Sequence, residues 1–211
     1  MTPGEGLIGI IPAAGRSSRI GGNPKPLLDT GSGTFLERTV RALGEGGAAS
    51  VHVGVRHEAG PVTAAVRRLG ARPHVPVDVD DGPIATIRTV IRTLRDEGEA
   101  PAAILFLPVD IPEVTPKVVR ALVESWCQFD APLVLPASRG RTGHPALFSG
   151  VLLDELLEPD LAEGARTIVE RHRADARIIE VDDEGILIDI DTLPEYRRRF
   201  PDAYRKRFQK W

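Results

Sequence analysis

The first stretch of the chain that could do chemistry joins an apolar run to a turn of small residues and two cations. The apolar run 8–11 ends at Pro12, and alanine, glycine and serine follow before Arg19 and Lys25. Short apolar runs bounded by proline and glycine are typical of buried strands. A turn of small residues lets backbone N–H groups approach an anion, and the two cations suit a polyphosphate. The alternative is an ordinary strand followed by a solvated loop with unrelated basic residues.

This loop matches neither of the two common glycine patterns that bind phosphate. It lacks the Gly-x-x-x-x-Gly-Lys-Ser/Thr of a P-loop and the Gly-x-Gly-x-x-Gly of dinucleotide-binding folds. If the loop holds phosphates, it does so in another way.

Acidic residues that could bind a metal ion occur later in the chain. Asp110 ends the apolar run 104–109, where an unpaired carboxylate is costly unless it meets a cation or hydrogen-bond donors. Asp189 and Asp191 are two apart in a run that indicates a strand, so both side chains would project to one face. Mg²⁺ typically takes one or two carboxylates together with phosphates and water. The alternatives are a turn or helix-capping role for Asp110 and, for Asp191, support of the next helix N-terminus. We adopt the latter for Asp191 and predict Asp189 as the partner of Asp110.

The elements that must position these residues follow from the apolar spacing. The predicted strands are 8–11, 50–55, 72–77, 102–109, 132–136, 178–181 and 186–190, and the predicted helices are 35–43, 62–69, 84–94, 115–127, 152–157, 165–172 and a last one opening at Thr192. Residues 138–145 are polar and predict a loop. Strands that alternate with helices favour a parallel sheet covered on both faces. The carboxyl ends of such strands share one rim, so residues 12–15 and Asp110 should lie together.

Two helix starts carry a capping box, in which a threonine and a glutamate three residues later cap one another. Thr34 with Glu37 precedes the first predicted helix, and Thr192 with Glu195 precedes the last. These boxes fix where the two helices should begin.

Composition narrows the class of protein. The 211 residues carry a net charge of −3, which points to neither nucleic acid nor a membrane surface, and their number fits one domain over 1–211. The single cysteine, Cys127, excludes an internal disulfide, and we expect it to fill the core. No signal-peptide pattern or membrane-length apolar run is present, so we expect a cytoplasmic protein. The basic segment 197–211 predicts a solvated helix end and tail, with an anionic partner or oligomer contacts as alternatives.

Five motifs occur in a fixed order. They are Pro12-Ala13-Ala14-Gly15 with Arg19, Gly21 and Pro24-Lys25-Pro26-Leu27-Leu28; Asp81-Gly82-Pro83-Ile84-Ala85; Pro108-Val109-Asp110-Ile111-Pro112; Gly140-Arg141-Thr142-Gly143-His144-Pro145-Ala146-Leu147-Phe148; and Asp189-Ile190-Asp191-Thr192. In this order they resemble the MobA-like NTP transferases, the group holding the molybdenum-cofactor cytidylyl- and guanylyltransferases. The resemblance covers about residues 7–196. It implies an α/β fold of three layers, αβα, with a Rossmann-like, mostly parallel sheet of the glycosyltransferase-A or nucleotide-diphospho-sugar transferase type.

The resemblance also implies a reaction and the residues for it. An acceptor oxygen would attack the α-phosphorus of an NTP, and pyrophosphate would leave. Catalysis would fall on Lys25 near the α-phosphate, Arg19 near the pyrophosphate and Asp110, with Mg²⁺ on Asp110 and Asp189. The residues implied in nucleotide binding are Pro12, Ala13, Ala14, Gly15, Arg16, Ser17, Asp81, Gly82 and Pro83, and those near the acceptor are Arg141 and His144.

The motifs leave the two substrates open. Gly82-Pro83-Ile84-Ala85 is closer to the guanylyl branch, whereas Gly143-His144-Pro145 is closer to the cytidylyl branch. We favour CTP and a small phosphorylated acceptor of the molybdopterin type. The alternatives are a sugar-phosphate or polyol-phosphate nucleotidylyltransferase and a non-catalytic nucleotide-binding module. The oligomeric state stays open.

Overall fold

Eight strands form the centre of the computed structural model, which describes residues 6–16, 20 and 23–209. They are β1 (Leu7–Pro12), β2 (Ser50–Gly54), β3 (Arg72–His74), β4 (Ala103–Phe106), β5 (Leu133–Ser138), β6 (Arg141–Thr142), β7 (Ala146–Ser149) and β8 (Arg177–Glu180). The sheet order is β3-β2-β1-β4-β7-β5-β6, and β8 pairs with β5. The pairs β1–β2, β1–β4, β2–β3 and β5–β8 are parallel, whereas β7 is antiparallel to β4 and β5, and β6 to β5.

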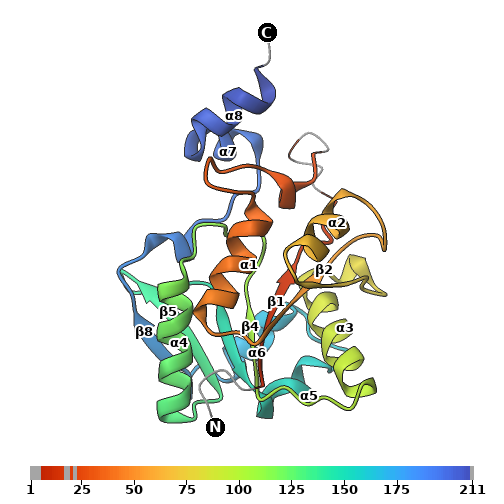
Figure 1. The fold of residues 1–211 in the computed structure, drawn as a ribbon. Helices are drawn as coiled ribbons and strands as arrows, with labels where there is room; N and C mark the ends of the chain where they lie inside the picture. Colours follow the sequence, from red (N-terminus) through yellow and green to blue (C-terminus); the bar gives the residue numbers. More distant parts are fainter. Residues whose placement is uncertain (1–5, 17–19, 21–22, 210–211) are drawn as a thin grey trace.

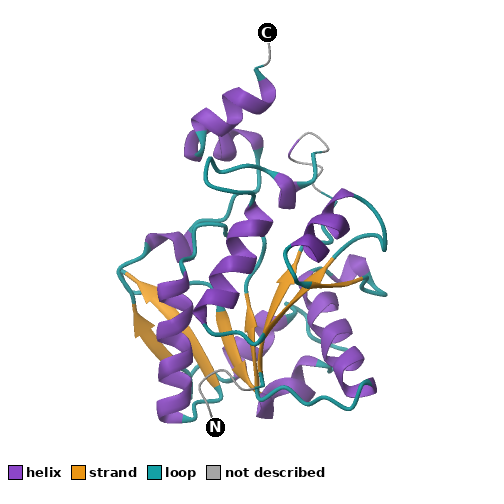
Figure 2. Ribbon diagram, viewed as in Figure 1, coloured by secondary structure: helices purple, strands orange, loops and turns teal. Residues whose placement is uncertain are grey.

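Alternating side chains on the central strands divide the core between the two faces of the sheet. In β1, Leu7 and Ile11 join one apolar cluster, and Ile8 and Ile10 join the other. Helices α1 (Phe35–Gly46), α2 (Pro61–Arg68) and α4 (Pro116–Phe129) pack on the first face, and α3 (Pro83–Asp96), α5 (Leu153–Leu156) and α6 (Ala165–Arg171) on the second. Figures 1 and 2 show the strands between these helices. The predicted three-layer αβα class is confirmed.

Both predicted capping boxes are present and set where their helices begin. The Thr34 hydroxyl accepts from the Glu37 N–H, and the Glu37 carboxylate accepts from the Thr34 N–H. Thr192 and Glu195 form the same pair at the start of α7 (Leu193–Arg199), which α8 (Pro201–Phe208) follows. Short 3-10 helices complete the fold: η2 (Lys25–Leu27), η3 (Val79–Asp81), η4 (Gly150–Leu152) and η5 (Glu184–Leu187).

The predicted strand over 186–190 is wrong. Residues 184–187 form η5, because the Asp183 carboxylate accepts from the Gly185 N–H and tightens the turn. The chain then passes the end of β4, where the Ile190 N–H donates to the Asp110 carbonyl at 2.9 Å. This segment therefore crosses the rim of the sheet and adds no strand to it.

Smaller corrections concern three other places. The predicted loop 138–145 contains β6, and the strand β7 after it was not predicted. Cys127 is exposed, since the buried stripe of α4 ends at Trp126 and turns away from the next position. None of the described helices combines the length and the apolar character needed to span a membrane.

Candidate active site

A cavity of about 360 Å³ opens where β1 and β4 end at the same edge of the sheet. The loop after β1 forms one wall with Pro12, Ala13, Ala14, Gly15 and Arg16. The other walls come from the segment after β4, from η2, from the start of α3 and from the turn before α7. The parallel pairing of β1 and β4 places both carboxyl ends on one rim, so residues 12–15 and Asp110 lie together as predicted.

Lys25 joins two carboxylates at this cavity. Its Nζ donates to Asp110 Oδ2 at 3.2 Å and to Asp191 Oδ1 at 2.6 Å. The Lys25 side chain is only 14% exposed, so these contacts lie largely out of water. The Asp110 carboxylate, at the end of the apolar run, thus contacts a cation, and this contact offsets the desolvation cost of its position.

The turn before α7 holds the Asp191 backbone in place. One oxygen of the Glu195 carboxylate accepts from the N–H groups of both Asp191 and Thr192, at 3.0 and 2.8 Å. The Thr192 hydroxyl and these two N–H groups lower the pKa of Glu195. Asp191 therefore does more than support the helix N-terminus, because its own carboxylate contacts Lys25 across the cavity.

Asp189, the predicted partner of Asp110, is exposed and is not one of the described residues that line this cavity. The alternation that would turn Asp189 and Asp191 to one face requires a strand, and this segment is not a strand. Asp189 instead acts electrostatically on His144: burial lowers the pKa of that imidazole, and the charges of Asp110 and Asp189 oppose this shift. The structure thus brings Asp191 to Asp110 and Lys25 in the place predicted for Asp189. The Thr192–Glu195 capping box is the sequence signal that could have indicated the role of Asp191, because this box ends the apolar run beside Asp191.

The loop after β1 is anchored to its neighbours. The Ala13 N–H donates to the Gly54 carbonyl at 2.9 Å, and Arg56 Nη1 donates to the Ala14 carbonyl at 3.2 Å. Backbone donors for a phosphate would therefore come from Ala14 onward. Ser17 and Arg19, predicted to contact the triphosphate, lie outside the described residues.

The opposite wall combines backbone with a buried hydroxyl. Gly82, with φ +77°, and Pro83 line the cavity at the start of α3. Thr86 also lines it, and its Oγ1 is buried without a hydrogen-bond partner among the described residues. Thr86 was not among the predicted site residues, although a threonine within the apolar stripe of α3 is a detectable signal. Asp81 lies elsewhere: it lines a second cavity and accepts from Arg88 Nη1 at 3.3 Å.

This second cavity, of about 810 Å³, adjoins the first, with Pro83 and Pro108 lining both. Apolar side chains including Phe106 and Phe148 line it, and His144 faces it. Burial lowers the pKa of His144, while the carboxylates of Asp110 and Asp189 and the Phe106 carbonyl act in the opposite direction. The imidazole is therefore neutral at pH 7. Arg141, the other predicted acceptor residue, is exposed and is not one of the described lining residues.

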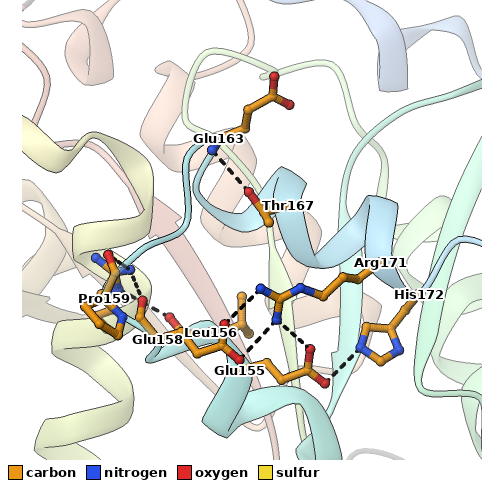
Figure 3. A network of polar contacts seen from close by, with 9 residues as sticks. Glu155, Leu156, Glu158, Pro159, Glu163, Thr167, Arg171 and His172 are labelled. Carbon is orange, nitrogen blue, oxygen red and sulfur yellow. Dashed lines mark hydrogen bonds and ion pairs between the residues drawn. The ribbon is translucent and has the colours of Figure 1, made fainter.

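Ion pairs fix the far wall of the second cavity. Figure 3 shows Arg171 reaching Glu155 and Glu158, and His172 against Glu155, which ties α6 to α5. The arginines that line this wall are paired as well, Arg166 with Glu163 at 3.4 Å and Arg173 with Glu170 at 3.7 Å. The wall is therefore charged but locally balanced.

The carboxylates at the first cavity have the chemistry of ligands for a hard divalent metal ion. Within the described ranges, no group of three or more His, Cys, Asp or Glu could hold a metal. Asp110 and Asp191 together offer two hard oxygen ligands on either side of Lys25. Mg²⁺ suits such a set, because it takes one or two carboxylates and fills its other positions with phosphates and water. A site with two acids, one ammonium and a loop of small residues can bind a metal–triphosphate unit.

The fold and this site define a nucleotidyltransferase, and comparison with known proteins gives its family. A model described as the MobA-like NTP transferase domain matches residues 9–176. The chain belongs to the MobA-like NTP transferase family, so the resemblance seen in the five motifs is confirmed. No curated protein is a significant match to the chain.

Solved structures share the fold over nearly the whole chain. Rv0371c from Mycobacterium tuberculosis H37Rv has 25% identity and a TM-score of 0.73, covering 93% of this chain and 98% of that one. The structure of Rv0371c in complex with manganese has 24% identity and a TM-score of 0.70, covering 93% of this chain and 98% of that one. A nucleotidyl transferase from Methanothermobacter thermautotroptrophicus has 24% identity and a TM-score of 0.71, covering 95% and 98%. CMP:2-keto-3-deoxy-manno-octonic acid synthetase complexed with CTP has 17% identity and a TM-score of 0.70, covering 95% and 99%.

Proposed function

We propose that this nucleotidyltransferase uses Mg²⁺ to transfer a nucleoside monophosphate from an NTP, with CTP favoured, to a small phosphorylated acceptor, releasing pyrophosphate. The observation that carries the proposal is the Lys25 ammonium between the carboxylates of Asp110 and Asp191 at one end of the cavity. Among such acceptors we favour one of the molybdopterin type, as the resemblance to the MobA-like family implies. The CTP complex of the 2-keto-3-deoxy-manno-octonic acid enzyme supports CTP as the nucleotide.

Asp110 and Asp191 would hold the divalent ion, and the manganese complex of Rv0371c supports a divalent metal in this fold. When bound, the ion supplies charge neutralisation for the phosphate oxygens. We assign Asp191 to this role in place of Asp189, because Asp191 shares Lys25 with Asp110.

Lys25 would stabilise the negative charge that develops at the α-phosphate. Two acids already fix its ammonium, so little reorganisation is needed when the substrate binds. Backbone N–H groups from Ala14 onward would hold the triphosphate, and Arg19 stays the predicted contact of the leaving pyrophosphate. The Gly82 backbone and the Thr86 hydroxyl would meet the nucleoside.

The second cavity would take the acceptor. It opens onto the first beside Pro83 and Pro108, so an acceptor there can reach the α-phosphorus. The neutral His144 would hydrogen-bond the acceptor without adding charge, and the apolar floor would bind its body. A phosphate nucleophile is already an anion, so no general base is required. Arg141 remains a predicted acceptor contact from the loop beside His144.

Pyrophosphate release tests the proposal. The purified protein is incubated with Mg²⁺, each of CTP, GTP, ATP and UTP, and either molybdopterin or a sugar 1-phosphate. We expect release with CTP and molybdopterin, none after chelation of Mg²⁺, and a loss of about 100-fold or more in Lys25→Ala. Lys117→Ala, which removes an exposed lysine of α4, is the matched control and should retain activity. Turnover of sugar phosphates alone would favour the sugar-phosphate alternative, and release by no pair of substrates would contradict the proposal.

A further inference from the structure

The basic C-terminal segment is more than a solvated tail. Tyr204 and Phe208 of α8 pack on Tyr196 of α7, with ring centroids 6.1 and 6.2 Å apart. Tyr196 is fully buried and also packs on Phe35 of α1, with the two ring centroids 6.0 Å apart. These aromatic contacts dock α8 on the core, and Figure 1 shows α7 and α8 beyond the end of α1, beside the segment that leads into it.

One cation of α8 reaches the short helix that carries Lys25. Arg207 donates through Nη1 to the Leu27 carbonyl and through Nη2 to Asn23 Oδ1, both at 3.2 Å. Asn23 and Leu27 lie on either side of Lys25. Leu27 ends η2, where carbonyl groups lack partners within the helix and a cation is favoured.

The chain just after η2 is tied to the same unit. The buried Tyr196 hydroxyl donates to the Asp29 carbonyl at 2.6 Å. On the other side of η2, Asn23 Nδ2 donates to the Ile20 carbonyl at 3.3 Å, which fixes the amide that Arg207 contacts. The C-terminal helices therefore hold the Lys25 segment both before and after the lysine.

We propose that Arg207 is a positioning residue, which through Asn23 and Leu27 keeps η2 where Lys25 can contact Asp110 and Asp191. The guanidinium fork suits this role, because two of its nitrogens contact acceptors on two sides of the turn, whereas a lysine ammonium is a point charge. The positioning matters for catalysis only if the proposed function holds. Arg207 lies beyond residues 9–176, so this part comes from outside the segment that the family model matches.

Chemical labelling of Lys25 tests the positioning without any turnover. Wild-type protein, Arg207→Ala and Arg205→Ala are treated with an acetylating reagent, and mass spectrometry follows Lys25, with the exposed Lys117 as internal reference. Arg205 pairs with Asp202 on its own helix, so it is the matched control. Loss of the bridge should raise the Lys25 labelling rate about fivefold in Arg207→Ala, and Arg205→Ala should match the wild type. An unchanged rate in a folded Arg207→Ala protein would overturn the inference.

Two further variants keep the test sharp if Arg207→Ala fails to fold. Asn23→Ala removes one acceptor and leaves α8 untouched, and Arg207→Lys keeps the charge but not the fork. Both should raise the labelling of Lys25, and full protection in both would overturn the bridge. With the substrates above, Arg207→Ala should lower kcat/KM for CTP about tenfold, and Arg205→Ala should not. A wild type that releases no pyrophosphate refutes the proposed function, whereas the labelling result still decides the positioning.

Discussion

A buried histidine pair makes the stability of this protein depend on pH. His52 Nδ1 and His74 Nε2 lie 3.0 Å apart on the neighbouring strands β2 and β3, and Ser50 Oγ lies 2.9 Å from His52 Nε2. Burial lowers the pKa of His52 from 6.5 to about 4, and the charges of His74 and Arg72 add to this. The pair supports the candidate site, because the chain after β3 supplies Pro76 to the first cavity.

The direction follows from the two pKa values. The unfolded chain binds a proton at His52 below pH 6.5, whereas the folded protein binds it only near pH 4. The contribution of His52 to the free energy of unfolding is therefore fully present above pH 6.5 and is lost as the pH falls toward 4. The span between these values corresponds to about 3 kcal/mol of unfolding free energy.

Urea unfolding of the wild type and His52→Gln at pH 7.5, 6, 5 and 4 measures the contribution of His52 to the free energy of unfolding. Other groups titrate in the same range, so the quantity of interest is the difference between the two proteins. The wild type should lose about 3 kcal/mol more than His52→Gln between pH 7.5 and 4. His57→Gln, which replaces an exposed histidine, should follow the wild type. Equal pH dependence in the wild type and His52→Gln would show that burial of His52 does not make stability depend on pH.

Three other substitutions test separate parts of the structure. Thr86→Val removes a buried hydroxyl without a partner in the described chain, so unfolding free energy should not fall, while the Kd for CTP by calorimetry rises about fivefold; an unchanged Kd would exclude a nucleotide contact. Gly143→Ala places a Cβ 2.4 Å from the Ile186 carbonyl oxygen, so urea unfolding should show a loss of about 2 kcal/mol and the His144 loop should shift; wild-type stability would contradict the close approach. Thr192→Ala should lower the free energy of unfolding by about 1 kcal/mol through the lost cap, and Thr192→Ser should restore it. Equal stability of Thr192→Ala and the wild type would contradict a stabilising cap.

The sequence predicted the features that depend on local patterns. The apolar run ending at Pro12 and the two capping boxes follow from rules about neighbouring residues, and the structure has all three. The proximity of residues 12–15 to Asp110 could also be predicted, because parallel strands end on one rim. These predictions needed no knowledge of how side chains pack.

Features that depend on contacts between distant segments could not be predicted from the sequence. Whether Asp189 or Asp191 meets Asp110 depends on the path of a segment that crosses the rim, and alternation applies only within a strand. The contacts of Arg207 with Asn23 and Leu27 join residues about 180 positions apart, and nothing in the local pattern marks them. The basic charge of the C-terminal segment therefore led to a prediction of solvent exposure, although α8 packs on α7.

We propose that Asp110 and Asp191 together bind the metal of a metal–triphosphate unit beside Lys25. Electron paramagnetic resonance of free Mn²⁺, titrated with protein and CTP, measures metal affinity without an acceptor. Asp191→Asn should raise the Kd for Mn²⁺ about tenfold or more, whereas the matched Asp189→Asn should leave it within about twofold. Weakened Mn²⁺ binding in Asp189→Asn with wild-type binding in Asp191→Asn would show that Asp189, and not Asp191, is the metal ligand.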